Sequence, residues 1–291
     1  MLTDKQKQKI VDALKPKEAN YKSGIKFSTA IGLNPAQWSR IKNGDFEGVL
    51  STEKWIRLAR ENDVELTDRA PWKVARTPVY EYLTAQLESC QNDSISMLLC
   101  DIADIGKTFT AKTYAKMHAN AVYIDCSQVK TKQALIREIS KQFGLSPNGH
   151  YQDVYRDLIT YVKAVIKPVV ILDEAGDLQR DAFLELKALW NALENHCGWA
   201  MMGADGLKEK IRRAINFKKV GFTELFSRYG SRYQKITPDS AQDRKRFLEA
   251  QAAMIIKANT PEGKEVDVNK VLRNSDASLR RIHVELSKLA M

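Results

Sequence analysis

The stretch Ile95-Ser-Met-Leu-Leu-Cys-Asp-Ile-Ala-Asp-Ile-Gly-Lys-Thr-Phe-Thr110 decides the fold. It opens with an apolar run typical of a buried strand, and a helix is predicted over 108–117. Between them, residues 101–108 match the pattern G-x-x-x-x-G-K-[ST] at every position except the first, where Asp101 stands. Backbone N–H groups and a helix N-terminus hold phosphates in such a loop. The stretch therefore predicts a strand, a P-loop and a helix, with a triphosphate bound at the loop.

Each chemical role in this loop has a candidate residue. Lys107 is expected to reach the β and γ oxygens of the nucleotide, and the Thr108 hydroxyl to take a Mg²⁺ position. Asp101 is expected to lower nucleotide affinity unless its carboxylate points away from the phosphates. The predicted nucleotide-binding residues of the loop are Asp101, Ile102, Ala103, Asp104, Ile105, Gly106, Lys107, Thr108 and Phe109.

The second half of the site is predicted in Pro168-Val-Val-Ile-Leu-Asp-Glu174, an apolar run that ends in two carboxylates. The run fits a buried parallel strand. Asp173 is expected to hold Mg²⁺, and Glu174 to orient or deprotonate the attacking water. Two independent motifs at this separation indicate an ATPase that uses ATP and Mg²⁺.

Around these motifs, helices alternate with short apolar segments from about residue 79 onward, which predicts an α/β fold with a parallel sheet. The expected strands are Ile95–Cys100, Ala121–Asp125, Val169–Asp173, Trp199–Met202 and Tyr233–Ile236. Residues 64–80, which contain Pro71 and Pro78, are typical of a linker.

The N-terminal region is predicted to be a small helical module. Ile10, Val11 and Leu14 recur at helical spacing before Pro16, which is expected to end the first helix. Phe27–Gly44 then predicts two short helices joined by a turn at Gly32, and the second begins with Asn34 as N-cap and Pro35. A further helix is expected at about 52–62, burying Trp55, Ile56 and Leu58 or Ala59.

The two short helices resemble the helix-turn-helix of phage repressors, whose second helix enters the major groove of DNA. That resemblance implies that four residues meet bases or phosphates: Gln37, Ser39, Arg40 and Asn43. The alternative is a helical hairpin that packs on a partner protein or on the rest of the chain.

The formal charge of +10 is unevenly distributed. Residues 1–63 hold 12 Lys+Arg against 8 Asp+Glu, residues 64–206 hold 15 against 18, and residues 207–291 hold 19 against 10. Such basic regions can neutralise phosphates and release counterions, which gives affinity for nucleic acid that is independent of sequence. The alternative is a soluble basic protein with no such partner.

Other features exclude several classes of protein. The four cysteines are far apart and form no C-x-x-C pair, so they are expected to be buried thiols. Nothing approaches the roughly 18 consecutive apolar residues needed to cross a membrane, and the N-terminus lacks a signal-peptide core. A cytoplasmic protein without membrane partners is expected.

Residues 80–291 resemble the AAA+ ATPases. Leu225-Phe-Ser-Arg-Tyr-Gly-Ser-Arg232 is similar to the box that presents an arginine finger, which implies Arg228 as the finger and Arg232 as the second candidate. Asp276-Ala-Ser-Leu-Arg-Arg-Ile282 looks like the sensor-2 helix of the lid, with Arg280 or else Arg281 facing nucleotide. Gly198–Leu207 looks like the fourth strand and sensor-1 turn, where Ala204 or Asp205 occupies the sensor position.

The order of modules resembles the family of the phage Mu B transposition protein and the insertion-sequence helper ATPases. The expected modules are a helix-turn-helix module (1–65), a linker (66–80), an AAA+ core (81–236) and a helical lid (237–291). The resemblance implies a protein that oligomerises on double-stranded DNA in its ATP state, largely without sequence preference, and delivers that DNA to a transposase. The alternatives are a helicase loader or replication initiator, and a nucleotide-gated DNA-binding regulator with little turnover.

Overall fold

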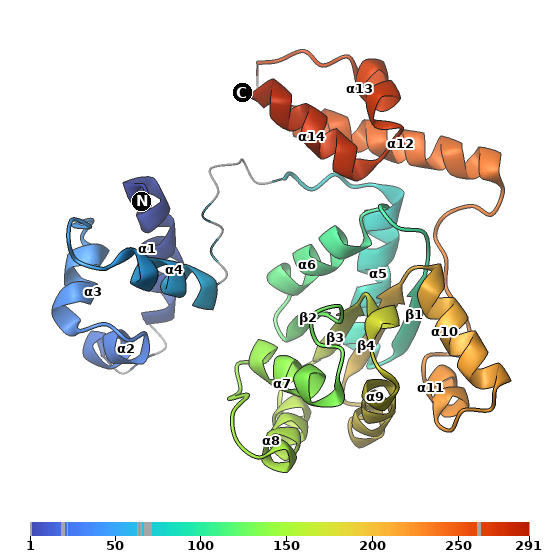
Figure 1. Cartoon of the computed structure of the whole chain (residues 1–291), viewed down its shortest axis with the longest axis horizontal. Helices are drawn as coiled ribbons and strands as arrows, with labels where there is room; N and C mark the ends of the chain where they lie inside the picture. The colour runs from blue at the N-terminus through green and yellow to red at the C-terminus, as the bar shows by residue number, and fades with distance from the viewer. Residues whose placement is uncertain are drawn as a thin grey trace. The chain divides into compact units, whose positions relative to one another are not determined.

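The computed structural model describes residues 2–18, 21, 23–62, 64, 66, 72–260 and 263–290. The chain divides into two compact units, Met1–Trp72 and Lys73–Met291. Figure 1 shows the first as a group of short helices and the second as a sheet surrounded by helices. Of the expected linker, residues 67–71 lie outside the described residues, and a helix begins at Pro78.

In its described part, the N-terminal unit consists of helices packed around a small core. They are α1 (Asp4–Glu18), α2 (Gly24–Ala30), α3 (Pro35–Lys42) and α4 (Thr52–Glu61). Asn34 is the N-cap of α3 as predicted, and its side chain accepts a hydrogen bond from the N–H of Gln37. The core includes Phe27 and Trp38, whose rings meet edge to face at 5.0 Å between centroids. The DNA-binding role of α2 and α3 stays a prediction.

Two expectations for this unit were wrong. The first helix continues through Pro16, where one backbone hydrogen bond is lost, and ends two residues later at Glu18. Ile56 is exposed, since Trp55, Leu58 and Ala59 share the buried face at helical spacing and Ile56 falls on another side.

The second unit is organised by a parallel sheet, so the predicted α/β class is confirmed. Its strands are β1 (Ser96–Cys100), β2 (Ala121–Asp125), β3 (Val169–Asp173) and β4 (Gly198–Gly203), in the order β1-β4-β3-β2. All pairings are parallel. The carboxyl ends of the strands therefore lie along one edge of the sheet, where polar side chains after β1 and β3 can converge.

Helices cover both faces of this sheet (Figure 1). The helices are α5 (Pro78–Asp93), α6 (Lys107–Met117), α7 (Lys132–Gln142), α8 (Tyr151–Ala164), α9 (Arg180–Ala192), α10 (Asp205–Asn216) and α11 (Phe222–Arg228). Alternate residues of the strands enter two cores. Leu99, Ile171 and Met202 pack with α5 and α6, whereas Leu98 and Leu172 pack with the helices α7 to α11.

The predicted strand Tyr233–Ile236 does not form. In its place the described residues contain an isolated parallel bridge between Leu99 and Gln234, closed by hydrogen bonds from Gln234 N to Leu98 O and from Cys100 N to Gln234 O. The pairing ends there because the N–H groups of Ile236 and Thr237 turn to a side chain, as described below.

Three helices follow this segment: α12 (Ala241–Asn259), α13 (Val268–Ser275) and α14 (Leu279–Ala290). We call them the C-terminal helices. Asn259 at the end of α12 exchanges hydrogen bonds with the backbone of Lys73, of 2.7 and 3.1 Å. The segment leading into α5 is thereby held against α12.

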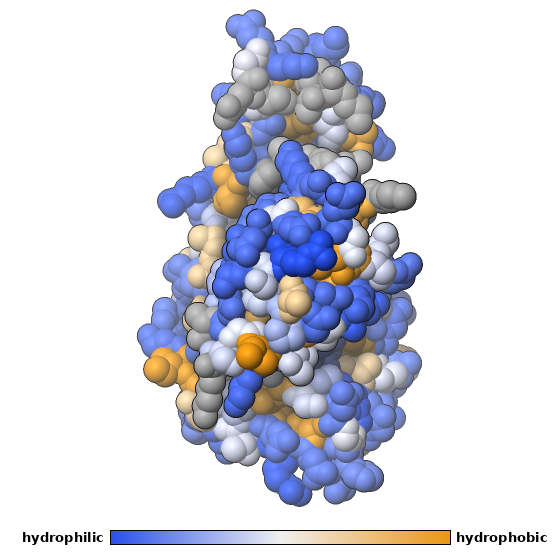
Figure 2. Space-filling model, turned by 90° about the vertical axis from the view of Figure 1, so that its left-hand side faces the viewer, coloured by the Kyte–Doolittle hydropathy of each residue, from blue (hydrophilic) through white to orange (hydrophobic). Residues whose placement is uncertain are grey.

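Among the described residues, none of the helices is both long and apolar enough to cross a bilayer. The face shown in Figure 2 is mostly hydrophilic, with hydrophobic residues in small scattered groups. All four cysteines are buried free thiols, as expected.

Gly198 offers a test of the packing between β4 and α5. A Cβ at this position would lie 2.1 Å from the backbone oxygen of Cys90, so α5 would have to retreat. Gly198→Ala should lower the free energy of unfolding by about 1–3 kcal/mol, which at this size is roughly 2–4 °C in Tm per kcal/mol. Thermal unfolding measures the effect.

Gly206→Ala is the matched control, because a Cβ there meets nothing within 4 Å. It should leave Tm unchanged or raise it slightly, since alanine favours helix. Equal Tm values for the two variants would contradict the packing described for β4.

Candidate functional site

The loop between β1 and α6 has the geometry needed to receive phosphates. Gly106 precedes the helix with φ +96°, a conformation that favours glycine, and no side chain caps the N-terminus of α6. The first N–H groups of a helix have no partner inside the helix. The start of α6 therefore offers backbone donors and the positive end of a helix dipole to an anion.

Lys107 lies inside this loop. Its ammonium donates hydrogen bonds to the carbonyl oxygens of Asp101, at 2.8 Å, and Ile102, at 2.6 Å. The residue is only 7% exposed, and burial lowers the pKa of its side chain. Two carbonyl groups neutralise the buried Lys107 ammonium only in part. A phosphate bound in the loop would supply the full negative charge that this ammonium lacks.

The two residues expected to hold Mg²⁺ are in direct contact. The Thr108 hydroxyl donates to Asp173 Oδ2 over 2.6 Å, across the gap between α6 and β3. Tyr123, from the neighbouring β2, donates to the same oxygen over 3.0 Å. Sequence analysis missed Tyr123, because only the pairing of β2 with β3 brings it to this carboxylate.

The chemistry of this donor pair fits Mg²⁺. The described residues contain no group of three or more His, Cys, Asp or Glu side chains that would form a complete metal cage. Mg²⁺ is usually bound by one or two protein oxygens, with phosphates and water completing an octahedron. Thr108 and Asp173 provide such a partial set, which suits a cation that arrives with a nucleotide.

Glu174 directly follows the end of β3 and has an unusual backbone. Its φ is +50°, and its N–H donates to Asp173 Oδ1 over 3.0 Å. Desolvation, and next the charge of Asp173, raise the pKa of the Glu174 carboxyl. A carboxylate of raised pKa beside the phosphate site is a suitable general base, because it accepts a proton more readily.

Asp101 replaces the first glycine of the loop, yet its carboxylate is directed away from the nucleotide edge. It accepts four hydrogen bonds, of 2.6–2.8 Å, from Ile102 N, Ile236 N, Thr237 N and the Thr237 hydroxyl. The side chain is completely buried. Three of these bonds come from the segment before α12, so the carboxylate points away from the phosphates, which is the condition under which no penalty on nucleotide affinity is expected.

The C-terminal helices contact the loop at two further points. Gln251 of α12 donates to Ile105 O over 3.0 Å, and the Ser278 hydroxyl donates to Asp104 Oδ2 over 2.7 Å. Arg280 Nε lies 3.8 Å from Asp104 Oδ1, and its side chain is 85% exposed. The structure thus brings Arg280 to the loop, whereas Arg281 shows only a backbone contact to Ser278.

Arg228 lies elsewhere, at the end of α11. It donates to Asn191 Oδ1 and Glu224 O, and its guanidinium stacks 5.4 Å from the centre of the Trp190 ring.

Arg232 is exposed. Ala204 is the N-cap of α10 and Asp205 its first residue. None of the contacts described for these residues joins them to the loop of the same chain.

The four residues proposed to meet DNA differ in availability. Ser39 and Asn43 are exposed on α3. Gln37 is engaged in the capping box and also donates to Val49 O, while Arg40 is paired with Asp45 at 2.7 Å. Lys42, on the same helix, is paired with Glu18 at 2.6 Å.

Asp101→Gly tests the buried network. The substitution restores the usual P-loop residue but leaves the donors of Ile236 and Thr237 without their acceptor. Buried N–H and O–H groups that lose a charged acceptor lower the free energy of unfolding by several kcal/mol in total. The Tm should therefore fall by about 5 °C or more. Asp239→Ala is the control. It removes a carboxylate in the same segment that is 95% exposed, and it should leave Tm nearly unchanged. A Tm for Asp101→Gly at or above that of the wild type would refute the role of the network.

Comparison with known proteins agrees with this geometry. Residues 78–211 match a family model described as an AAA domain. The Aeropyrum pernix ORC1 protein in complex with DNA has a TM-score of 0.51 at 15% identity, over 78% of this chain and 64% of that chain. The Aeropyrum pernix ORC2 protein, with ADPNP and ADP, has a TM-score of 0.52 at 18% identity, over 76% and 64%.

A Walker-type ATPase of Pyrococcus abyssi, PABY2304, has a TM-score of 0.50 at 16% identity, over 77% of this chain and 71% of that one. The chain therefore spans about 64% of the length of the two Aeropyrum proteins. None of the curated proteins matches it in sequence. At these identities the likeness is one of fold, and the finer resemblance to the Mu B family stays a prediction. The loop geometry and the two comparisons thus agree: residues 78–211 match the model of an AAA domain, and the chain is similar in fold to the Aeropyrum pernix ORC1 and ORC2 proteins.

Proposed function

We propose that this protein binds ATP with Mg²⁺, hydrolyses it, and binds double-stranded DNA in its ATP state. The observation that carries the proposal is the convergence of Lys107, Thr108, Asp173 and Glu174 at one edge of the sheet. The contact of 2.6 Å between Thr108 and Asp173 joins the two motifs into one site. A protein that only bound a nucleotide would not need the carboxylate of Glu174 beside it.

Each residue has a distinct role in hydrolysis. Lys107 leaves the carbonyl oxygens of the loop and holds the β and γ phosphates, while the N–H groups at the start of α6 bind the phosphate oxygens. Glu174 orients a water molecule and takes its proton. Thr108 and Asp173 would hold Mg²⁺, which would neutralise negative charge on the phosphates.

The position of the Asp101 carboxylate supports turnover over the alternative of a regulator with a damaged loop. That alternative rests on a negative charge beside the phosphates. Three of the four hydrogen bonds of Asp101 direct this charge to Ile236 and Thr237 instead. We therefore favour an active ATPase.

The case for DNA rests on charge and on fold. A formal charge of +10 favours a polyanionic partner. One protein of similar fold is known in complex with DNA. We propose that subunits assemble on DNA in the ATP state, and that the protein works in the cytoplasm.

Two processes fit such a DNA-bound ATPase. The likeness in fold to ORC proteins supports a replication initiator or helicase loader more directly than transposition. The resemblance of module order to the Mu B family supports delivery of DNA to a transposase. Affinity capture of the Mg²⁺- and ATP-bound protein separates them, because the first predicts a replicative helicase as partner and the second a transposase.

Glu174→Gln should bind ATP but turn it over about 10²–10⁴ times more slowly, since an amide orients water without accepting its proton. Phosphate release and ATP binding measure the two effects. Lys107→Ala is the comparison, because it should lose binding itself. Turnover by Glu174→Gln within tenfold of the wild type would assign the base to another group.

Arg228 is proposed to act on the nucleotide of a neighbouring subunit. Arg228→Ala should leave ATP binding intact and lower hydrolysis by about 10³-fold or more. Mixing this variant with Lys107→Ala creates junctions that contain one intact arginine and one intact loop, so hydrolysis should partly recover. Co-assembly without recovery would show that Arg228 has only the structural contacts to α9.

A further inference from the structure

The basic surplus of the C-terminal region is concentrated in one short part of the ATPase unit. Residues 207–232 contain eight Lys+Arg against two Asp+Glu, whereas residues 233–291 contain eleven against eight. Seven of these eight cations lie on α10, on α11 or in the loop between them, and Arg232 follows α11. Of the net charge of +9 in residues 207–291, +6 therefore lies in residues 207–232.

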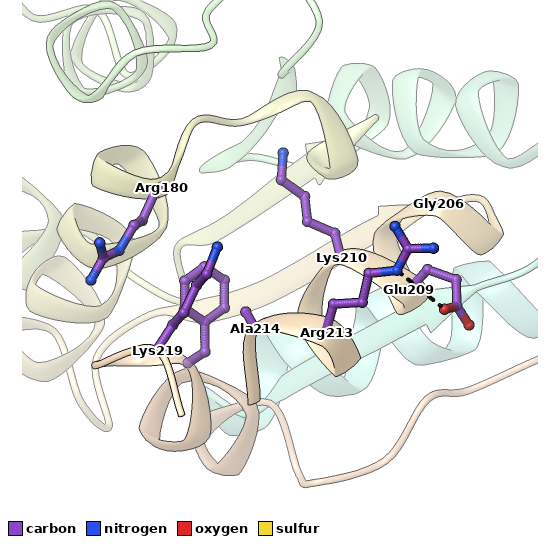
Figure 3. Close-up of a pocket in the computed structure, with 8 residues that line it drawn as sticks. Arg180, Gly206, Glu209, Lys210, Arg213, Ala214 and Lys219 are labelled. Atoms are coloured by element: carbon purple, nitrogen blue, oxygen red, sulfur yellow. Dashed lines mark ion pairs between the residues drawn. The ribbon is translucent and has the colours of Figure 1, made fainter. Parts of the chain in front are cut away.

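This charge borders a pocket of about 400 Å³ between α9 and α10, shown in Figure 3. We call it the α9–α10 pocket. Its lining includes Phe222, the carboxylate of Glu209 and four cations, which are Arg180, Lys210, Arg213 and Lys219. In Figure 3, Arg180 lies at one side, Glu209 and Arg213 lie at the other, and Lys210 and Lys219 lie between them.

The cations of the pocket are under-neutralised. Glu209 is shared, at 3.0 Å from Arg212 and 4.0 Å from Arg213. Across the described part of the chain, Arg180 and Lys219 take part in none of the ion pairs observed. This contrasts with α3, where Arg40 and Lys42 are both paired with carboxylates.

The neighbouring loop indicates a large partner. Phe217 and Val220, on either side of Lys218 and Lys219, are 75% and 71% exposed. Exposed apolar side chains beside cations suit a macromolecular surface better than a free nucleotide. Among macromolecules, the surplus of cations selects one with regularly spaced negative charge, and duplex DNA has that property.

We propose that the α9–α10 pocket and its rim bind the phosphate backbone of duplex DNA. The proposal rests on the proposed function of an ATP-dependent DNA-binding protein, and it assigns the contact to the ATPase unit instead of α3. Arg180, Arg213 and Lys219 contact phosphates, and no base is read. Binding is therefore independent of DNA sequence.

The same pocket adjoins the turn that follows Glu174. Lys210 donates two hydrogen bonds of 2.7 Å to Gly176 O and Leu178 O, in the turn that directly follows Glu174. A phosphate in the pocket attracts the Lys210 ammonium and so acts on the turn that positions Glu174. DNA bound here is expected to change the rate of ATP hydrolysis.

The test compares two full-length triple variants with the same loss of charge. Arg180→Ala/Arg213→Ala/Lys219→Ala alters the pocket, and Lys264→Ala/Lys270→Ala/Arg273→Ala alters exposed cations of the C-terminal region. Affinity for a random-sequence duplex is measured over a range of salt with an ATP analogue, together with ATP affinity, Tm and self-association.

The pocket variant should bind DNA about 100-fold more weakly at 0.1 M salt, with a salt slope reduced by up to about 2.7, at 0.9 per lost phosphate contact. Its ATP affinity and Tm should match the wild type, and DNA should no longer change its hydrolysis rate. The control should keep most of its affinity and its slope.

Equal losses in the two variants would overturn the proposal in favour of a diffuse charge effect. Unchanged DNA affinity with lost self-association would overturn it in favour of a neighbouring subunit as the occupant. Failure of the wild type itself to bind duplex would instead contradict the proposed function, which keeps the two failures distinguishable.

Discussion

The arrangement of the nucleotide site depends on the buried carboxylate of Asp101. A charge that is completely removed from water is costly unless donors surround it, and here four hydrogen bonds do so. Three of them come from Ile236 and Thr237, which lie between the last core segment and α12. The backbone of Asp101 is fixed as well, because its N–H donates to Gly203 O and its carbonyl accepts from Lys107. One residue thus joins the phosphate loop, β4 and the entry to the C-terminal helices.

This connection gives the C-terminal helices a physical route to the nucleotide. They also reach the loop through Gln251 to Ile105 and through Ser278 to Asp104. A change at the phosphates that moves the loop must therefore strain or break contacts with α12 and α14. We infer that ATP binding and the position of these helices are linked through the loop residues 101–105. Lys210 provides a second route, from the turn after Glu174 to the cationic surface of α10.

The sequence predicted the sheet well because its strands are continuous apolar runs with clear ends. The expected bounds of Ala121–Asp125 and Val169–Asp173 are those observed, and the strand before the P-loop differs by one residue. Tyr233–Ile236 forms only a bridge at Gln234, because the N–H of Ile236 donates to Asp101, which lies 135 positions earlier. Local pattern carries no information about such a partner. The same limit hid Tyr123 and Gln251, whose roles arise from strand order and from helix packing.

The distribution of charge along the sequence predicted the functional residues less well than the hydrophobic pattern predicted the strands. Counting by segment located the basic surplus in the last third of the chain, but the ion pairs decide which cations are free to act. The sequence predicted Arg40 as a DNA contact, but it is paired with Asp45, whereas Arg180, which was not predicted, borders the α9–α10 pocket. Whether a cation forms an ion pair depends on the neighbours that the fold places beside it. The residues that could contact DNA are therefore the ones that the sequence predicts least well.

The central claim is that a P-loop with aspartate at its first position remains a working ATP site. The most direct measurement is calorimetric titration of the wild-type protein with a non-hydrolysable ATP analogue, with Mg²⁺ and with the metal chelated. The account predicts saturable binding with a Kd below about 1 mM, the upper end of usual enzyme affinities, and weaker binding when Mg²⁺ is removed. Absence of saturable binding in the presence of Mg²⁺ would contradict it.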